Sequence, residues 1–559
     1  MSEAGVRPPG LGGAARGLWK VFTASKLELA ISIVMGLASG GASAWLLTFV
    51  TRALENGQRG TEAALAFFVL CLVALGSSVV SLVLLARIAQ ENLFNIRLWL
   101  SRCILAAPLD RVQALGPHRL MAALTSDVES IVMALETVPS LVIETAKIIA
   151  VFAYLYTLSP PLLLLVFVYV LVSVLTVQGP LGWAWRWLDE SRQTENALFG
   201  HFRAATEGGK ELKMDARRRQ AFLDEDMRGA ASLLKRQRQK SLVVFVLLDR
   251  WAETLFYLLL GLIIFVVPHY LTLNAESLTG FALAILFLGG PLTLVGGWLP
   301  TITKGMVAIR NIESMGLDLT RSAEPVGDRP GAFAAAHPAV LELIDVTHRY
   351  AGENGDAGYS LGPVSLRLKP GELVFLCGGN GGGKTTLALL LLGLLVPETG
   401  EIRLGGCVVE ESNREAYRQN FSAVFADAYV FDSLLGYTGQ EAQARAQELL
   451  ALLRLDQKVK ISAGRFSTTE LSRGQRKRLA LLTAYVEDRP FYLFDEWAAE
   501  QDPQFRELFY RQLLPDLKAR GKTVVVITHD DRYFDCADRL IRMNFGQLED
   551  STADPSRVA

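Results

Sequence analysis

One glycine-rich stretch in the second half of the chain has the residue types and the spacing that bind phosphate. It reads Gly378-Gly379-Asn380-Gly381-Gly382-Gly383-Lys384-Thr385 and fits the pattern G-x-x-x-x-G-K-[ST]. Glycines let backbone amides curl around phosphate oxygens, and a following helix N-terminus adds a favourable partial charge. We therefore expect this loop, with Thr386 behind it, to hold the phosphates of a nucleotide. Lys384 should reach the β- and γ-phosphates, and the Thr385 hydroxyl should bind Mg²⁺.

The flanking residues supply the context that such a loop requires. An apolar strand is predicted for residues 373–377 and a helix for residues 386–392, so the loop joins a strand to a helix. A glycine-rich turn without a ligand is the alternative. The motifs farther along the chain, at residues 471–475 and 491–496, argue against it.

A second chemical motif ends another predicted strand downstream. Residues 491–494 are apolar, and Asp495 and Glu496 follow them directly. A buried strand that delivers an aspartate to Mg²⁺ accompanies a phosphate loop in many nucleotide-binding proteins, so we expect Asp495 to hold the metal. Glu496 is placed to act as a general base on the attacking water. Two solvated acids at a strand end are the alternative.

The composition divides the chain into a membrane part and a soluble part. Of its 559 residues 51% are hydrophobic, the mean hydropathy is +0.28, and the apolar runs lie in roughly the first half. The net charge of -1 gives no electrostatic basis for binding nucleic acid. The five cysteines form no C-x-x-C pair, so we expect buried, inert thiols rather than a metal site or disulfides.

Six apolar runs are long enough to cross a bilayer. Two long polar segments, at residues 87–136 and 186–240, interrupt them, and each reads as helix, break, helix. An even number of spans places both termini on the same side of the membrane. The six runs cover residues 29–50, 63–86, 138–158, 162–178, 242–267 and 277–299.

Arginine and lysine predict which side that is. The segment 186–240 carries 13 of them, whereas the loops 51–62 and 268–276 hold only Arg52 and Arg59. By the positive-inside rule, both termini face the cytoplasm. A Pro- and Gly-containing stretch then separates the membrane part from the soluble part. The predicted parts are a cytosolic lead-in (1–26), a transmembrane domain with long cytosolic extensions (27–317), a linker (318–338) and a nucleotide-binding domain (339–559).

The breaks in the two polar segments, near Gly116 and Gly208, are candidates for contact with the nucleotide-binding domain. Ordinary helix-turn-helix connections are the alternative.

Charged residues within membrane spans are costly, so each is expected to have a partner or a function. Glu144 and Lys147 have the spacing to pair on one helix face. The set Asp249, Arg250 and Glu253 either lines a substrate cavity or satisfies itself, and we favour mutual pairing.

Between the two nucleotide motifs, the stretch Leu471-Ser472-Arg473-Gly474-Gln475 resembles LSGGQ, the signature of ATP-binding cassette (ABC) proteins. Residues 500–502, Glu-Gln-Asp, resemble the D-loop of that family. His529, which follows a predicted strand at 523–527, resembles its switch histidine, and Tyr350 resembles the aromatic residue that stacks on adenine. The order and spacing of these motifs make the resemblance specific.

The resemblance implies a six-span α-helical transmembrane domain of the type I ABC exporter kind, fused to an α/β P-loop ABC ATPase domain. It also implies that ATP lies between two subunits. One membrane domain and one ATPase domain make a half-transporter, so a second subunit is required and a homodimer is expected. The implied ATP contacts of one subunit are Tyr350, Lys384, Thr385, Asp495, Glu496 and His529, and those of the other are Ser472, Gly474, Gln475 and Asp502.

One position departs from the family pattern. A glutamine that contacts Mg²⁺ and water should follow Val424-Phe425, but Ala426 stands there. Alanine can do neither. Asp427 is adjacent, and either its carboxylate or backbone contacts would have to replace the glutamine.

Finer similarities lie in residues 494–503 and 528–534, which resemble bacterial exporters of cyclic peptides and siderophore-type peptides. The function implied is ATP-driven export of such a peptide across the bacterial inner membrane by alternating access. A lipid flippase or multidrug exporter would share the same motifs and is the alternative. An ATP-gated membrane protein without transport is a third reading, against which the intact Glu496 and His529 argue.

Overall fold

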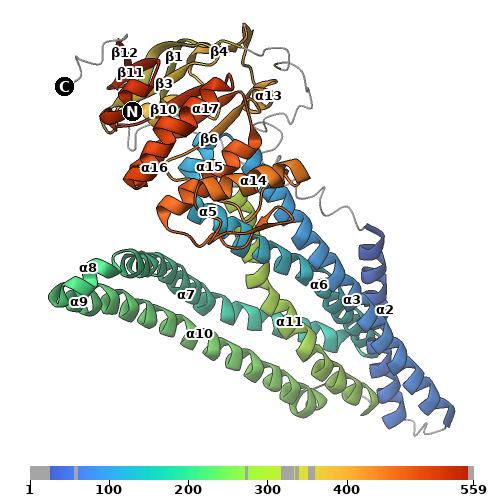
Figure 1. Cartoon of the computed structure of the whole chain (residues 1–559). Coiled ribbons are helices and arrows are strands. Elements are labelled where there is room, and N and C mark those ends of the chain that lie inside the picture. The colour runs from blue at the N-terminus through green and yellow to red at the C-terminus, as the bar shows by residue number, and fades with distance from the viewer. Residues whose placement is uncertain are drawn as a thin grey trace. The chain divides into compact units, whose positions relative to one another are not determined.

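The computed structural model describes residues 26–55, 61–270, 275–315, 333, 339–350 and 359–551. They form two compact units (Figure 1). The first, wholly helical, contains the described residues up to Trp99 together with Ala122–Ser314. The second contains Leu100–Met121 and the described residues from Met315 onward. Residues 1–25 of the expected lead-in, and all but Phe333 of the expected linker, lie outside the described residues.

Six long apolar helices dominate the membrane part, and each contains a segment long and apolar enough to cross a bilayer, as predicted. Two of them, α3 and α7, have 46 and 48 residues, more than the ~20 that a bilayer requires. The turn predicted at Ser159 separates α6 from α7. The six are α2 (Lys26–Glu55), α3 (Thr61–Ala106), α6 (Val128–Leu158), α7 (Pro160–Glu207), α10 (Arg228–Gly261) and α11 (Ala275–Ser314).

Both breaks in the polar segments lie where the sequence predicts them. Gly116, with φ +73°, separates α4 (Leu109–Leu115) from α5 (Pro117–Ala122). Gly208 ends α7 before α8 (Gly209–Met214) and α9 (Ala216–Ala221). Leu109 packs against the core of the predicted nucleotide-binding domain, so the first segment contacts that domain beside its break. For the second break the contact stays a prediction.

Shorter helical turns in this part of the chain are Ala123–Asp127, Phe222–Met227, Leu262–Val266 and Val267–His269.

Helix α6 is the element against which α2 and α11 pack, and glycines allow the close approach. A side chain at Gly36 of α2 would lie 2.4 Å from Ile143, and one at Gly305 of α11 would lie 2.4 Å from Ala134. Small residues at such contacts are typical of membrane helices, where packing drives association. Glycine at these two positions therefore sets the distance between the helices.

The charged residues within the spans are paired. Glu144, only 9% exposed, accepts a hydrogen bond from the Lys147 ammonium at 2.9 Å, as their spacing predicts. Arg250 pairs with both Asp249 and Glu253, so the favoured reading of mutual pairing is confirmed. In each case opposite charges on one helix compensate one another.

Two sheets build the domain in which the sequence predicts nucleotide binding. The larger has the order β12-β11-β3-β10-β9-β6 and is parallel apart from the edge strand β12. The smaller is antiparallel, with the order β2-β1-β4-β5. The larger sheet comprises β3 (Leu373–Gly378), β6 (Phe421–Val424), β9 (Phe491–Asp495), β10 (Thr523–Ile527), β11 (Arg539–Asn544) and β12 (Gln547–Ser551). The smaller comprises β1 (Leu341–Arg349), β2 (Ser360–Leu368), β4 (Thr399–Leu404) and β5 (Cys407–Val408).

Helices complete this domain and enclose two hydrophobic cores. The central strands β9 and β10 are buried along their whole length, which explains why they read as continuous apolar runs. A two-stranded hairpin, β7 (Ile461–Ser462) with β8 (Arg465–Phe466), lies apart from both sheets. The helices are α12 (Lys384–Leu391), α13 (Arg414–Arg418), α14 (Gln440–Leu452), α15 (Arg473–Glu487), α16 (Pro503–Leu508) and α17 (Leu514–Ala519), with shorter turns at Trp497–Glu500, Phe509–Leu513 and Asp531–Cys536.

The expectation of buried cysteines is wrong for part of the set. Cys103 and Cys377 are buried, but Cys407 is exposed, and Cys71 and Cys536 are half-buried. Cys407 lies on the two-residue strand β5 at the edge of the smaller sheet, where little structure covers it. None of the five forms a disulfide within the described residues.

The ion pair in α6 allows a test of the membrane domain. Replacing Glu144 by Leu leaves the half-buried Lys147 ammonium without its partner within an apolar span, so we expect the free energy of unfolding to fall by about 3 kcal/mol. The double variant Glu144→Leu/Lys147→Met should regain most of that loss. Unfolding of the purified chain in detergent micelles measures both.

The exposed pair Arg203–Glu207 on α7 is the matched control, with side chains 61% and 62% exposed. Glu207→Ala should change the free energy of unfolding by about 0.5 kcal/mol or less. A double variant as unstable as the sum of its two single variants would contradict the pairing argument.

Candidate functional site

The order of the parallel strands brings the predicted site residues together. Strands β3, β10, β9 and β6 are neighbours and run in the same direction, so their carboxyl ends meet along one edge of the sheet. The phosphate loop follows β3, His529 follows β10, and Asp495 with Glu496 ends β9. Ligands of open parallel sheets bind at this edge. Ala426 and Asp427 follow β6 at the same edge, and both are exposed.

The backbone of the phosphate loop explains its glycines. Gly378, Gly381 and Gly383 have φ values of +147°, +78° and +100°. A Cβ atom at Gly378 would lie 2.1 Å from the Met543 carbonyl oxygen. The loop then enters α12 at Lys384, whose buried ammonium donates to the carbonyl oxygens of Gly378 and Gly379 at 3.0 and 2.9 Å. The ammonium thus lies across the loop, within reach of any phosphate that the loop holds.

Thr385 and Asp495 approach each other as a metal site of this kind requires. The Thr385 hydroxyl donates to the Asp495 carboxylate at 3.3 Å, and Asp495 is 2% exposed. Burial, and then the charge of Glu496, raise the pKa of Asp495, while Thr385 and the ammonium groups of Lys384 and Lys477 oppose that shift. A hydroxyl and a carboxylate are oxygen ligands that suit Mg²⁺, which takes its other ligands from phosphates and water.

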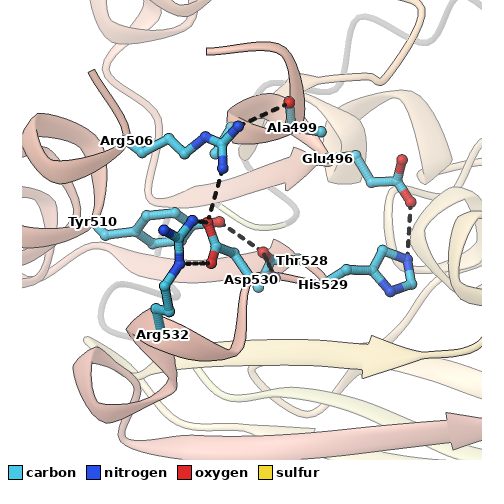
Figure 2. Close-up of a pocket in the computed structure, with 9 residues that line it drawn as sticks. Glu496, Ala499, Arg506, Tyr510, Thr528, His529, Asp530 and Arg532 are labelled. Atoms are coloured by element: carbon cyan, nitrogen blue, oxygen red, sulfur yellow. Dashed lines mark hydrogen bonds and ion pairs between the residues drawn. The ribbon is translucent and has the colours of Figure 1, made fainter. Parts of the chain in front are cut away.

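Glu496 has an unusual backbone that is held at both ends. Its φ and ψ are 49° and 34°, a left-handed conformation that a residue with a side chain seldom adopts. Its N–H donates to the Ile527 carbonyl at 3.0 Å, and its carbonyl accepts from the buried Lys477 ammonium at 3.0 Å. Its carboxylate lies 3.3 Å from His529 Nε2 (Figure 2). Backbone and side chain are therefore both oriented by neighbours.

A pocket of about 280 Å³ opens beside Glu496 and His529. Figure 2 shows Asp530 between the guanidinium groups of Arg506 and Arg532 on its other side. Arg506 also donates to the carbonyl of Gln501 at 2.9 Å, which ties the loop 500–502 to the residue after His529. No motif in the sequence predicts a chemical role for Arg506 or Asp530, because residues so far apart in sequence give no local signal of contact.

The signature residues form their own set at the start of α15. Ser472 caps that helix and exchanges hydrogen bonds with Gln475 at 3.3 and 3.4 Å. The Gly474 carbonyl accepts from Gln501, and Asp502 pairs with Arg478 at 2.8 Å. Within the described residues, no hydrogen bond or ion pair joins Ser472, Gly474, Gln475 or Asp502 to the phosphate loop.

Tyr350 lies just after β1, half-buried and edge-on to His348, with ring centroids 5.0 Å apart. Its N–H donates to the Tyr359 carbonyl at 2.9 Å. Its stacking on adenine stays a prediction.

Comparison with known proteins identifies the architecture. The family model described as ABC transporter matches residues 361–499. The ATP-binding protein SyrD of Pseudomonas syringae pv. syringae is 33% identical over 527 residues, which cover 92% of each chain. The chain belongs to the ABC transporter family. A solved bacterial Atm1-family ABC exporter with ATP bound has the same fold, with a TM-score of 0.73, 18% identity and 94% of each chain covered.

Other ABC relatives match part of the chain. The ATP-dependent lipid A-core flippase of Dechloromonas aromatica (strain RCB) is 29% identical over 296 residues, covering 51% of this chain and 49% of the flippase. The Nod factor export ATP-binding protein I of Burkholderia pseudomallei (strain 1710b) is 35% identical over 188 residues, covering 32% and 59%.

Family membership confirms several expectations. The chain is a multi-pass membrane protein with six candidate spans, its ABC domain binds ATP, and its activity is ATP-driven export. One transmembrane part and one ABC ATPase domain make it a half-transporter, which requires a partner subunit. The predicted fold class is likewise confirmed.

Lys477 offers a test of how the ABC domain orients Glu496. The variant Lys477→Met keeps the length of the side chain but removes the donor to the Glu496 carbonyl. If Glu496 acts on the attacking water, its displacement should lower kcat for ATP hydrolysis by about tenfold or more. The KM for ATP should change less than kcat does, because within the described residues Lys477 forms no hydrogen bond with the phosphate loop.

Lys522 is the matched control, since its ammonium also donates to a backbone carbonyl, that of Asp488, at 3.1 Å. It precedes β10, at the opposite edge of the sheet. Lys522→Met should hydrolyse ATP at the wild-type rate. An unchanged kcat in Lys477→Met would contradict the positioning of Glu496 by this contact.

Proposed function

We propose that this half-transporter exports a cyclic or siderophore-type peptide from the cytoplasm across the bacterial inner membrane, as a homodimer. The observation that supports a peptide as cargo is the resemblance of residues 494–503 and 528–534 to exporters of such peptides. The match to SyrD adds support because it extends over 92% of the chain and so includes the membrane part, which must accommodate the cargo.

In this proposal each ATP is held by two subunits. The phosphate loop, with Lys384 and Thr385, binds the phosphates of ATP in one subunit, and Tyr350 stacks on the adenine. Ser472, Gly474, Gln475 and Asp502 of the second subunit face the same nucleotide. The N-terminus of α15, capped by Ser472, adds a partial positive charge suited to the γ-phosphate.

Hydrolysis in this proposal uses residues at the sheet edge. Thr385 and Asp495 hold Mg²⁺, which neutralises charge on the β- and γ-phosphates when bound. Glu496 accepts a proton from the attacking water, and His529, 3.3 Å from its carboxylate, keeps that side chain oriented. Asp427 or backbone contacts take the place of the glutamine missing at Ala426.

Transport follows from the difference in ATP affinity between two states of the dimer. Binding of two ATP molecules favours the closed ATPase dimer, and the cytosolic segments near Gly116 and Gly208 pass that closure to the spans. Hydrolysis removes the contacts that hold the dimer closed. Both termini lie in the cytoplasm, where ATP is supplied.

A lipid flippase is the second candidate. The observation in its favour is the similarity to a relative named ATP-dependent lipid A-core flippase. That match covers about half of each chain. Residues 494–503 and 528–534 resemble exporters of peptides, so peptide export is the favoured proposal.

Measuring ATPase activity of the purified chain in lipid tests both parts of the proposal. Glu496→Gln removes the general base and should lower kcat by at least about a hundredfold. Glu507→Gln, an exposed acid on α16, is the matched control and should leave kcat unchanged. Full activity in Glu496→Gln would contradict the assigned base.

The cargo is tested in the same assay with cyclic peptides, siderophore precursors and lipids added separately. Stimulation of ATP hydrolysis by a peptide, absent in Glu496→Gln, is the expected result. Stimulation by lipid alone would favour the flippase instead.

A further inference from the structure

Tyr359, which precedes β2, lies directly against the phosphate loop. Its hydroxyl donates to the Gly382 carbonyl at 3.0 Å. A Cβ atom at the next residue, Gly383, would lie 1.9 Å from the same phenol oxygen. The loop and the phenol are therefore in contact at the point where the loop turns into α12. No motif in the sequence singles out this tyrosine.

The Gly382 carbonyl accepts a second hydrogen bond. The N–H of Gly546, in the turn between β11 and β12, donates to it at 3.0 Å. The Gly546 carbonyl in turn accepts from the N–H of Gly362 at 2.9 Å, three residues after Tyr359. Two segments distant in sequence, at Tyr359 and at Gly546, thus donate to one carbonyl oxygen of the phosphate loop.

Two donors on one carbonyl determine the orientation of its peptide unit. A trans peptide is planar, and its C=O and N–H point in opposite directions. Holding the Gly382 carbonyl toward Tyr359 and Gly546 therefore turns the N–H of Gly383 away from them. Neither glycine has a side chain that would restrict this rotation, and Gly383 has a φ of +100°. The hydrogen bonds must supply the restriction instead.

Tyr359 is suited to act as the donor. Burial, and then the neighbouring Tyr350, raise the pKa of its hydroxyl above the ordinary value, so the phenol keeps its proton at neutral pH. Its backbone carbonyl also accepts from Tyr350, the residue expected to stack on adenine. One residue thus connects the base end of the expected nucleotide site with its phosphate end.

We propose that Tyr359 is a positioning residue for ATP, whose hydroxyl holds the Gly382–Gly383 peptide so that the N–H of Gly383 points at the phosphates. The inference deepens the nucleotide site and rests on the proposed binding of phosphate by residues 378–385. It concerns the orientation of backbone donors, since the phenol itself does not touch the phosphates.

The test is nucleotide binding by the full chain in lipid nanodiscs, with wild type compared to Tyr359→Phe. Loss of one hydrogen bond should weaken binding of ATP and ADP by about three- to tenfold. Binding of AMP, measured by competition, should be unchanged, because AMP lacks the β- and γ-phosphates. If the substitution only disturbed the local structure, binding of all three nucleotides would weaken alike, which would contradict the positioning role.

Tyr492→Phe is the matched control. The Tyr492 hydroxyl is buried in β9, and within the described part of the chain it has no hydrogen-bond partner. Its removal should leave the affinity for all three nucleotides at the wild-type value. An effect in Tyr359→Phe that Tyr492→Phe reproduces would overturn the inference, because it would show that any tyrosine hydroxyl in this domain matters equally.

A third variant separates this inference from the proposed site itself. Lys384→Ala should weaken ATP binding strongly if the loop holds the phosphates. Unchanged ATP affinity in Tyr359→Phe, with loss in Lys384→Ala, would overturn the positioning by Tyr359 and leave the site intact. Unchanged affinity in both variants would overturn the phosphate site as well.

Discussion

Parallel pairing of β3, β10 and β9 is the constraint on which the nucleotide site depends. In this register Leu376 lies opposite Ile527, and Ile527 lies opposite Asp495. The phosphate loop follows β3, Thr528 and His529 follow β10, and Glu496 follows β9. These segments therefore leave the sheet at the same level. A slip of one residue in β9 would turn Asp495 to the other face and separate it from Thr385. Complete burial of β9 and β10 opposes such a slip.

Around that edge, buried charges are held by backbone carbonyls as well as by opposite charges. The ammonium of Lys384 binds two carbonyls of the loop, and that of Lys477 binds the carbonyl of Glu496. Buried charged groups destabilise a fold unless they are hydrogen-bonded, so these contacts are obligatory rather than incidental. They also orient the peptide groups that carry the chemistry. The left-handed conformation of Glu496 is maintained in this way.

The membrane part follows a different physical rule. The lipid interior holds no water that could form hydrogen bonds with the protein. Helix contacts there depend on close packing and on hydrogen bonds between polar groups of the protein itself. Gly36 and Gly305 bring α2 and α11 onto α6, and Ser32 of α2 exchanges hydrogen bonds with Ser81 of α3. Glu144 and Lys147 neutralise each other on α6.

What the sequence by itself determined is everything that short-range chemistry encodes. The phosphate loop, the strand ending in Asp495 and Glu496, the six apolar runs and the breaks at Gly116 and Gly208 were predictable, because each rests on residue types within a few positions of one another. The pairing of Glu144 with Lys147 was predictable for the same reason, since a helix brings residues i and i+3 together.

The tertiary structure alone decided the contacts between distant segments. Three hydrogen bonds join residues that share no motif. They run from Tyr359 to Gly382, from Lys477 to Glu496 and from Arg506 to Asp530. The exposure of Cys407 likewise depends on the position of β5 at a sheet edge. Strand order and register place these groups together, and both arise from packing of the whole domain, which no local pattern in the chain records.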